Sequence, residues 1–375
     1  MLSFTPGSTI ENQLKTLQVS LVEACKGLET ATAEEKDFLR KCALISNVGA
    51  TTRIENAVLT DVEIEWVDTV LSKDGKTTAY QENRQSIIDK LSKSRERSIE
   101  EVVGSRSVLT IIYLQAGEFK PLTQTTVRGL HRELLRYYPA ADHFAGAYKT
   151  VSNKVISRNN ETGEEHTVLE PTDPGVMTDM AMGELVDWYN ETIDTYHWPL
   201  LVAVEFTFRF LSIHPFQDGN GRLGRALFLL ILLQSGDQYL EEIASYIAID
   251  RKIEQNKSRY YSVLHQCSDG RFKADAKLYK FDIVVRFFLN IFESAIGDID
   301  LYRKKYADLQ MLSESAVSVL ECFKSNPEKK LKVAEIERTT GLPRRTSQFA
   351  LKTLTEKAFI QRLGKGAGSR YQLIF

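Results

Sequence analysis

The chain has 375 residues, with 48 Lys and Arg against 50 Asp and Glu, and a formal net charge of −2. This near balance excludes a general electrostatic attraction to nucleic acid or anionic membranes, so any such partner would need a local patch of positive charge. The N-terminus lacks the features of a secretory signal, and the most apolar run, residues 226–233, is too short to span a bilayer. Four cysteines without a CxxC pair argue against a zinc ribbon or a disulfide framework: Cys25, Cys42, Cys267 and Cys322. The sequence therefore predicts a soluble, cytoplasmic protein with no membrane partner.

Apolar residues recur at a spacing of three and four through the first third of the chain, which predicts helices. They are expected at residues 14–28, 34–45, 61–71, 81–91, 99–114 and 127–135. The alternation typical of strands is rare and first appears at 150–157 and 166–169, on either side of the turn-rich RNNETGEE, where Gly163 is available for a positive φ. These segments predict a β-hairpin embedded among helices.

Helical patterns resume after the hairpin, and the composition changes near residue 311. The helices are predicted at 175–195, 199–213, 224–234, 241–246, 252–267 and 278–309, and segment 199–213 is almost wholly apolar. From residue 328 to the end there are eleven Lys and Arg against four Asp and Glu. This part reads as a helix at 333–340, a turn at Gly341, a helix opened by Pro343, and two short strands around GKGAGS. The order resembles a winged helix-turn-helix module.

The stretch IHPFQDGNGRLGRALF, residues 213–228, places many polar residues directly before an apolar run. If 199–213 and 224–234 are helices, residues 214–223 form the loop between them and the first turn of the second helix. Unpaired amides and the positive end of the helix dipole make such a helix start suitable for phosphate. Gly219 and Gly221 would let the main chain approach an anion closely.

Four side chains of this stretch have chemistry that suits a bound polyphosphate. Arg222 and Arg225 are three residues apart and share a helix face, where both guanidinium groups can meet the same polyphosphate. Asp218 is a hard oxygen ligand for Mg²⁺, and a neutral His214 could take a proton from an attacking hydroxyl. Taken alone, His214 would be the structural end of a helix and the arginines would be surface charges. Their occurrence together beside an apolar helix, where polar groups are partly desolvated, favours a functional site.

The motif HPFQDGNGRLGR resembles the signature of Fic-domain proteins, His-x-Phe-x-(Asp/Glu)-Gly-Asn-Gly-Arg-x-x-Arg, at every defined position. The resemblance implies an enzyme that transfers AMP from ATP, with Mg²⁺, to a Ser, Thr or Tyr hydroxyl of a target protein or of itself. It makes His214 the catalytic base, Phe216 the anchor of the loop and Asp218 the Mg²⁺ ligand. It assigns phosphate binding to Gly219, Asn220, Gly221, Arg222 and Arg225. The kinase-like Doc branch departs from the Gly-Asn-Gly-Arg-x-x-Arg pattern, so adenylylation is favoured.

The hairpin corresponds in position to the flap that, in Fic proteins, overhangs the site and pairs with a strand of the target. Main-chain hydrogen bonds to its exposed edge would hold a target segment without reading much sequence. Without the resemblance, it would be taken for an ordinary surface hairpin. Downstream of the motif, IDRKIEQNKSRYYSVL resembles the family's helix on the adenine side. Its candidates for the adenine pocket are Asn256, Tyr260 and Tyr261, although tyrosines at helical spacing are more often core residues.

The segment ATTRIENAV, residues 50–58, resembles the inhibitory motif of the family, (Ser/Thr)-x-x-x-Glu-(Gly/Asn), with Thr51, Glu55 and Asn56. Asn56 suits the left-handed residue that ends a helix, which would put Glu55 at a helix C-terminus, where the dipole disfavours a carboxylate. A compensating cation is therefore expected, and the resemblance names Arg225. Glu55 on that guanidinium would make ATP bind unproductively, and removal of AMP from the target is a second activity that the resemblance implies. Without the resemblance, Glu55 would be a solvated surface residue.

The predicted fold is mainly α, with a Fic-type helical core, a β-hairpin flap and a C-terminal winged helix-turn-helix. The expected divisions are an N-terminal helical region at 1–104 with the inhibitory helix around 46–56, the core at 105–294 with the flap at 149–170 and the motif at 214–225, a connecting helix at 295–310, and the winged module at 311–375.

Two functions of different class remain open at this point. One is an autoinhibited adenylyltransferase with an accessory module, and the other is a DNA-binding regulator whose Fic core senses a nucleotide. The retention of both His214 and Asp218 favours the enzyme, because a sensor needs no base. The winged module could equally serve as a dimerisation or protein-docking module, which leaves a homodimer open. Its candidate DNA contacts are Arg344, Arg345, Lys352, Arg362, Lys365 and Arg370.

Overall fold

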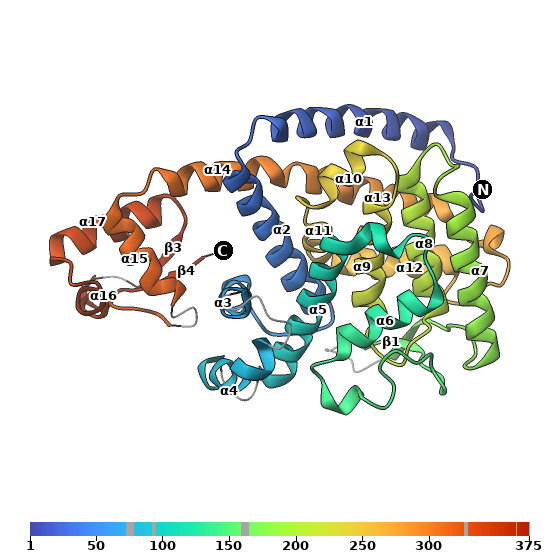
Figure 1. The fold of residues 1–375 in the computed structure, drawn as a ribbon, viewed down its shortest axis with the longest axis horizontal. Helices are drawn as coiled ribbons and strands as arrows, with labels where there is room; N and C mark the ends of the chain where they lie inside the picture. Colours follow the sequence, from blue (N-terminus) through green and yellow to red (C-terminus); the bar gives the residue numbers. More distant parts are fainter. Residues whose placement is uncertain (73–78, 92–94, 159–164, 326–328, 365, 375) are drawn as a thin grey trace. The chain divides into compact units, whose positions relative to one another are not determined.

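A computed structural model describes residues 1–72, 79–91, 95–158, 165–325, 329–364 and 366–374. The protein is mainly helical and divides into two compact units, Met1–Ala57 with Glu100–Ile299 and Val58–Ile99 with Asp300–Phe375 (Figure 1). The domain boundaries expected from the sequence stay predictions. No helix within the described ranges is both long enough and apolar enough to cross a membrane.

The first unit is an assembly of helices with one β-hairpin, and two of its helices, α5 and α14, continue into the second unit. The helices are α1 (Ser8–Glu29), α2 (Ala33–Ile54), α5 (Glu96–Gln115), α6 (Gln124–Leu135), α7 (Val176–Thr192), α8 (Pro199–Ile213), α9 (Asn220–Leu233), α10 (Gln238–Ala244), α11 (Ile249–Gln255), α12 (Lys257–Ser268), α13 (Phe281–Ile296) and α14 (Asp298–Gln310), with short 3₁₀ turns at Ala116–Phe119, Pro139–Ala141 and Ala276–Leu278.

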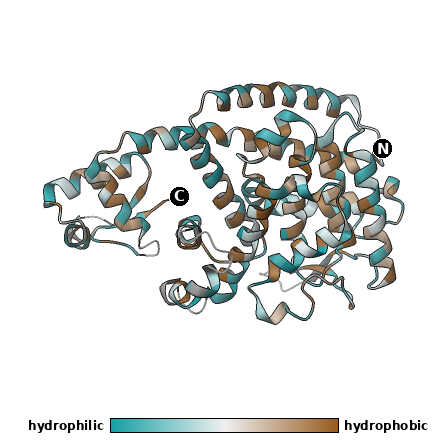
Figure 2. Cartoon of the chain, in the orientation of Figure 1, coloured by the Kyte–Doolittle hydropathy of each residue, from teal (hydrophilic) through white to brown (hydrophobic). Residues whose placement is uncertain are grey.

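α8 and α9 form the core of this unit and pack directly on each other. Nearly every residue of both helices is buried, which accounts for their apolar sequences. Helices α7 and α13 pack on α8, while α2, α6 and α10 pack on α9. By contrast, α1 buries one face only, and apolar and hydrophilic residues alternate along it (Figure 2). The loop that joins α8 to α9 is therefore anchored at both ends in buried helices.

The predicted hairpin is present as β1 (Val155–Arg158) and β2 (Glu165–Leu169), which pair antiparallel with an irregularity after Val155. The expected first strand, 150–157, began too early. The residues before β1 instead bind the loop between α8 and α9. The amide of Lys149 donates to the carbonyl of Pro215, and the side chain of Asn153 donates to the carbonyls of His214 and Phe216. Gly163 and its turn lie outside the described residues.

Several predicted helices have different limits in the structure. The helix expected at 34–45 and the inhibitory helix expected around 46–56 are one helix, α2, which ends at Ile54. The apolar periodicity lapses after residue 45 because small and polar residues are buried there, although the helix continues. The helix expected at 252–267 is two helices, α11 and α12, which are separated at Asn256 (φ −119°). The helix expected at 278–309 is likewise interrupted, at Gly297 between α13 and α14. α9 begins at Asn220 rather than at 224, so both motif arginines are helical.

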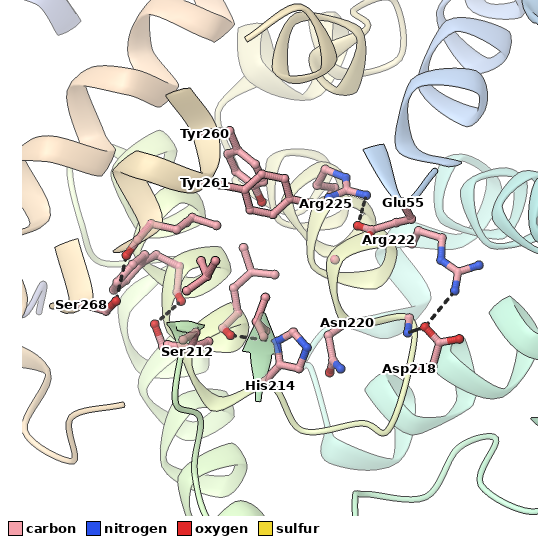
Figure 3. A pocket seen from close by; sticks show the side chains of 18 of the residues that line it. Glu55, Ser212, His214, Asp218, Asn220, Arg222, Arg225, Tyr260, Tyr261 and Ser268 are labelled. Carbon is pink, nitrogen blue, oxygen red and sulfur yellow. Dashed lines mark hydrogen bonds and ion pairs between the residues drawn. The ribbon is translucent and has the colours of Figure 1, made fainter. Parts of the chain in front are cut away.

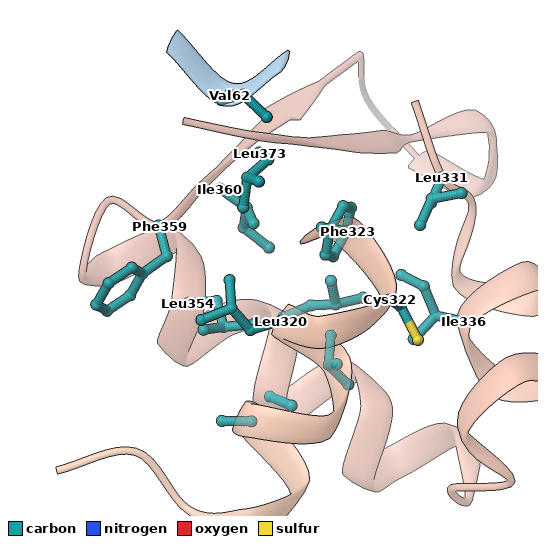
Figure 4. Packing of buried hydrophobic residues seen from close by; sticks show 14 residues of the cluster. Val62, Leu320, Cys322, Phe323, Leu331, Ile336, Leu354, Phe359, Ile360 and Leu373 are labelled. Carbon is teal, nitrogen blue, oxygen red and sulfur yellow. The ribbon is translucent and has the colours of Figure 1, made fainter. Parts of the chain in front are cut away.

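The second unit is built around one cluster of buried apolar side chains (Figure 4). Besides parts of α5 and α14 it contains α3 (Asp61–Ser72), α4 (Ala79–Leu91), α15 (Glu314–Lys324), α16 (Val333–Thr340), α17 (Arg344–Glu356), β3 (Ile360–Leu363), a 3₁₀ turn at Gly366–Gly368 and β4 (Arg370–Leu373). Phe323, Ile336, Leu354 and Leu373 bring α15, α16, α17 and β4 into the cluster, and Val62 adds α3. The sequence predicted α16, α17 and both strands. That these elements form a winged helix stays a prediction.

Candidate functional site

The loop after α8 is closed by its own side chains. Asn220 accepts a hydrogen bond from the amide of Phe216 at 2.8 Å and donates one to its carbonyl at 2.7 Å, so this side chain holds the loop rather than facing a ligand. The ring of Phe216 is fully buried and stacks on the imidazole of His131, with ring centroids 3.7 Å apart. Phe216 therefore lies in the core, as expected for a residue that anchors the loop.

The start of α9 is open enough for an anion. Gly219 is the residue before the helix, and its φ of 79° is a left-handed conformation that glycine adopts without strain. A Cβ atom placed on Gly221 would overlap Oε1 of Glu55 and would lie 3.2 Å from Nη1 of Arg225. The carboxylate of Glu55 thus lies directly against the first turn of α9. There, unpaired amides and the helix dipole favour negative charge.

His214 ends α8 in a left-handed conformation (φ 50°, ψ 59°), which turns its side chain away from the helix and into a cavity. Its Nδ1 lies 3.3 Å from the carbonyl oxygen of Leu211. A carbonyl can only accept, so Nδ1 carries the proton and Nε2 of the neutral ring keeps its lone pair. Burial, with a contribution from the charge of Lys149, lowers the pKa of His214 to about 4. The imidazole is therefore neutral at pH 7 and has the form that a general base requires.

Asp218 and Arg222 form a pair at the edge of the cavity. Oδ1 of Asp218 accepts from the amide of Gly219 at 2.6 Å and from Nη2 of Arg222 at 3.3 Å (Figure 3). Arg222 also lies 3.7 Å from Glu101. The Asp218 side chain keeps 39% of its surface exposed. Within the described part of the chain no group of three His, Cys, Asp or Glu side chains could hold a metal by itself. A single exposed carboxylate instead fits Mg²⁺ that arrives with phosphate oxygens and water, as this ion usually does.

Arg225 is the most enclosed charge of the site, with 1% of its side chain exposed. Its Nε donates to Oγ1 of Thr51 at 2.9 Å, and its Nη2 donates to the carbonyl of Thr51 at 3.0 Å. Nη2 also donates to Oε1 of Glu55 at 3.0 Å (Figure 3). The buried carboxylate of Asp250 is 3.8 Å away on another side. Burial alone would lower the pKa of Arg225, but the charges of Glu55 and Asp250 raise it above its ordinary value. The guanidinium group therefore stays charged with Glu55 as a partner.

Glu55 reaches Arg225 because of how α2 ends. The amide of Asn56 donates to the carbonyl of Arg53, and the amide of Ala57 donates to that of Thr52, which is the Schellman pattern of a helix C-terminus. Asn56 has a φ of 73°. The sequence predicted both this left-handed residue and the position of Glu55 at the helix end, and the structure confirms them. Arg53 fastens the same turn to Glu254 of α11 through hydrogen bonds of 2.7 and 3.0 Å.

A cavity of about 190 Å³ brings most of the predicted site residues together (Figure 3). Its lining includes Glu55, His214, Asp218, Gly219, Asn220, Gly221, Arg222, Arg225, Tyr260 and Tyr261. Val155, Val168 and Leu169 of the hairpin line it as well, so the hairpin borders the site. Asn256 is not among the residues that line it. Asn256 is exposed, and its side chain donates to the carbonyl of Lys252 in the preceding helix, α11.

His131 contributes to the site and was missed at the sequence level. The amide of Gly146 donates to its Nδ1 at 2.9 Å, so Nε2 carries the proton and donates to the carbonyl of Asp218, also at 2.9 Å. Burial lowers the pKa of His131 to about 4, which keeps the ring neutral. One signal could have indicated it: His131 lies on the apolar face of the helix predicted at 127–135, where a polar residue needs a partner.

The family model and similar known proteins indicate the same family. Residues 121–232 match the family model described as Fic/DOC family. The chain is 30% identical over 100 residues to "Protein adenylyltransferase Fic" of Drosophila willistoni, and 29% identical over 89 residues to "Protein adenylyltransferase fic-1" of Caenorhabditis briggsae. These matches cover 27% and 24% of this chain but only 18% and 16% of the two relatives.

Solved structures support the same assignment at the level of the fold. A Fic family protein from Desulfovibrio desulfuricans matches with a TM-score of 0.55 and 21% identity, over 100% of this chain and 98% of that one. A Fic domain containing signaling protein from Bacteroides thetaiotaomicron matches with a TM-score of 0.57 and 25% identity, over 78% and 96%. Fold and motif define a helical protein whose residues 121–232 resemble the Fic/DOC family.

Proposed function

We propose that this protein is an adenylyltransferase that transfers AMP from ATP to a Ser, Thr or Tyr hydroxyl of a target protein, and of itself. One observation carries the proposal: a single cavity unites a neutral imidazole, an exposed carboxylate and a helix start flanked by two arginines. The names of the two curated relatives agree with this chemistry. The matched segment is a minor part of each relative, so the activity is assigned here from the site.

In the proposed reaction the hydroxyl oxygen attacks the α-phosphorus of ATP and forms a new P–O bond, while the bond to the bridging oxygen breaks and pyrophosphate leaves. Nε2 of His214 takes the hydroxyl proton, since this atom is the unprotonated one. The amides of Gly219 to Gly221, with Arg222 and Arg225, hold the phosphates and stabilise the leaving group. Asp218 would hold Mg²⁺, which neutralises phosphate charge when bound. Tyr260 and Tyr261 are the remaining candidates for the adenine side.

Glu55 is proposed as a brake on this reaction. Its carboxylate is bound to the guanidinium of Arg225 and fills the space over Gly221, where a terminal phosphate would otherwise bind. ATP that enters beside Glu55 must leave its γ-phosphate without this cation, in a pose unsuited to transfer. The same carboxylate is near enough to the cavity to orient a water molecule, so removal of AMP from a modified target is proposed as a second activity.

The hairpin is proposed as the place where the target protein docks. Val155, Val168 and Leu169 border the cavity, and a sheet of two strands leaves an edge of each strand without a neighbour in the sheet. A target segment that adds to this edge would bring a hydroxyl toward His214 through main-chain hydrogen bonds.

The test is incubation with α-labelled ATP and Mg²⁺, followed by mass spectrometry for an added AMP. Wild type is expected to label weakly, Glu55→Gly strongly, and Glu55→Gly with His214→Ala not at all. Glu29→Gly, the same substitution at the exposed C-terminal end of α1, is the matched control and is expected to behave as wild type. Equal labelling of wild type and Glu55→Gly would contradict the proposed inhibitory role of Glu55. Binding of ATP without labelling in any variant would favour the nucleotide-sensing regulator instead.

A further inference from the structure

The second unit carries a groove that the catalytic proposal does not use. It has a volume of about 620 Å³ and lies between the start of α16, the exposed face of α17 and the two strands. Its lining residues are Lys332, Val333, Ala334, Arg344, Gln348, Lys352, Thr355, Glu356, Arg362, Gly366, Ser369 and Tyr371. All of them belong to the second unit, so the groove does not depend on how the two units are arranged.

The groove is basic in a chain that is slightly acidic overall. Lys332, Arg344, Lys352 and Arg362 are exposed and line it, against a single carboxylate, Glu356. That carboxylate lies 3.7 Å from Lys352 and is itself largely exposed, so it offsets only part of the charge. Four cations around one concave surface are the local patch that a chain with a net charge of −2 needs in order to bind a polyanion.

The guanidinium group of Arg362 is held in place before any ligand arrives. Its Nε and Nη2 both donate to Oγ of Ser369, at 3.0 and 2.8 Å, and Ser369 is buried. Arg362 pairs across the strands with Tyr371, which puts both side chains on the same face of the hairpin. A fixed guanidinium beside an aromatic ring suits phosphate better than a freely rotating side chain does, because less conformational freedom is lost on binding.

α17 has the shape and the surface of a helix that enters a groove of nucleic acid. Its buried residues recur at helical spacing: Ser347, Ala350, Leu351 and Leu354. The last three belong to the apolar cluster and fix this face of the helix. The opposite face exposes Arg344, Arg345, Gln348 and Lys352, all of which have side-chain donors. Phe349, 66% exposed on the same helix, offers an apolar contact for thymine methyl groups. The major groove of DNA is wide enough to admit one α-helix.

From these features we infer that the second unit binds duplex DNA, with α17 in the major groove. The four cations of the groove contact phosphates: Lys332, Arg344, Lys352 and Arg362. The donor side chains on one exposed helix face favour a duplex over an acidic protein, because they can reach base edges as well as phosphates in a groove of DNA. This inference is independent of the adenylyltransferase activity, because it uses none of the residues of the cavity in the first unit.

The test is fluorescence anisotropy of a labelled duplex with the full-length protein, over a series of salt concentrations. Four phosphate contacts predict a slope of log K against log salt of about −3.6, which is about 150-fold weaker binding for a fourfold rise in salt. Arg344→Ala with Lys352→Ala should reduce the slope to about −1.8, so that the same rise in salt costs only about 12-fold. The control, Lys15→Ala with Lys304→Ala, removes the same charge from exposed positions outside the groove and should keep the full slope.

Two results would overturn the inference. One is equal binding by the groove variant and the control variant, which would mean that the groove is not the contact surface. The other is binding of poly-glutamate as tight as that of the duplex, which would mark the groove as a docking site for an acidic protein. Labelling with ATP in the Glu55→Gly background should be the same with and without the groove substitutions, because the groove contributes no residue to the cavity. The circular dichroism spectrum and the urea unfolding midpoint of the groove variant, compared with those of the control variant, verify that it folds.

Discussion

Replacement of Glu55 by glutamine should strengthen the binding of ATP. The substitution keeps the size of the side chain but removes the charge that Arg225 now neutralises at 3.0 Å. A hydrogen bond between charged groups contributes about 1.5–3 kcal/mol. Because 33% of the Glu55 side chain is exposed, we take the lower end, about 1.5 kcal/mol. The triphosphate no longer has to displace this contact, so its dissociation constant should fall about tenfold.

The assay is titration calorimetry with a non-hydrolysable ATP analogue and Mg²⁺, for wild type and Glu55→Gln. AMP is the internal control: it lacks the β- and γ-phosphates, does not compete for Arg225, and should bind both proteins equally. A tenfold gain for the triphosphate with no gain for AMP is the expected pattern. Equal affinity of the triphosphate for the two proteins would refute the reasoning, because the contact at Arg225 would then not oppose ATP. A gain of the same size for AMP would mean that Glu55 obstructs the cavity as a whole.

Three further predictions concern the support of the site. His131→Leu should lower the free energy of unfolding by about 1–3 kcal/mol, measured in urea, because the carbonyl of Asp218 loses its donor. The same loss should raise the Mg²⁺ concentration needed for labelling. An unchanged Mg²⁺ dependence would show that His131 does not position Asp218 for the metal. Burial lowers the pKa of His214 to about 4, so the rate of labelling by Glu55→Gly should stay constant between about pH 6 and 8 and fall only as the pH approaches 4. A midpoint near the ordinary histidine pKa of about 6.5 would contradict this prediction. Arg53→Met removes the ion pair between α2 and Glu254. Self-labelling, measured by mass spectrometry, should rise above that of wild type but stay below that of Glu55→Gly. No increase would show that this ion pair is not needed to hold Glu55 on Arg225.

The motif loop and the end of α2 were predictable because local chemistry determines them. Gly219 and Asn56 adopt left-handed conformations that few other residues tolerate, and each marks a helix boundary that can be read from a few neighbouring positions. The apolar run after the motif predicted a buried helix for the same reason: its composition alone excludes an exposed position. Element type and motif position follow from such local constraints.

What the sequence did not predict depends on contacts between distant segments. Asn47 is buried in α2 because its side chain donates to the carbonyl of Ile247 and accepts from the amide of Asp250, about two hundred positions away. No local pattern indicates such a partner, so residues 34–45 and the inhibitory helix around 46–56 were expected as separate segments and not as one helix. His131 was missed for the same reason, since Asp218 becomes its neighbour only in the folded chain. Asn256 was expected on the adenine side from its place in the sequence; in the structure it is the exposed residue between α11 and α12 and does not line the cavity.

Glu55, the proposed brake, and ATP, the proposed substrate, would use the same source of positive charge. Glu55 lies at the C-terminal end of α2, whose dipole repels a carboxylate, and against the N-terminal turn of α9, whose dipole attracts one. The carboxylate is therefore held by Arg225 and α9 and not by its own helix, and these are the groups proposed to bind the phosphates of ATP. A substitution that weakens this positive region weakens inhibition and substrate binding together. Only a change on the α2 side, at Glu55 or at the contacts that fasten its helix, can release the brake and leave the phosphate site intact.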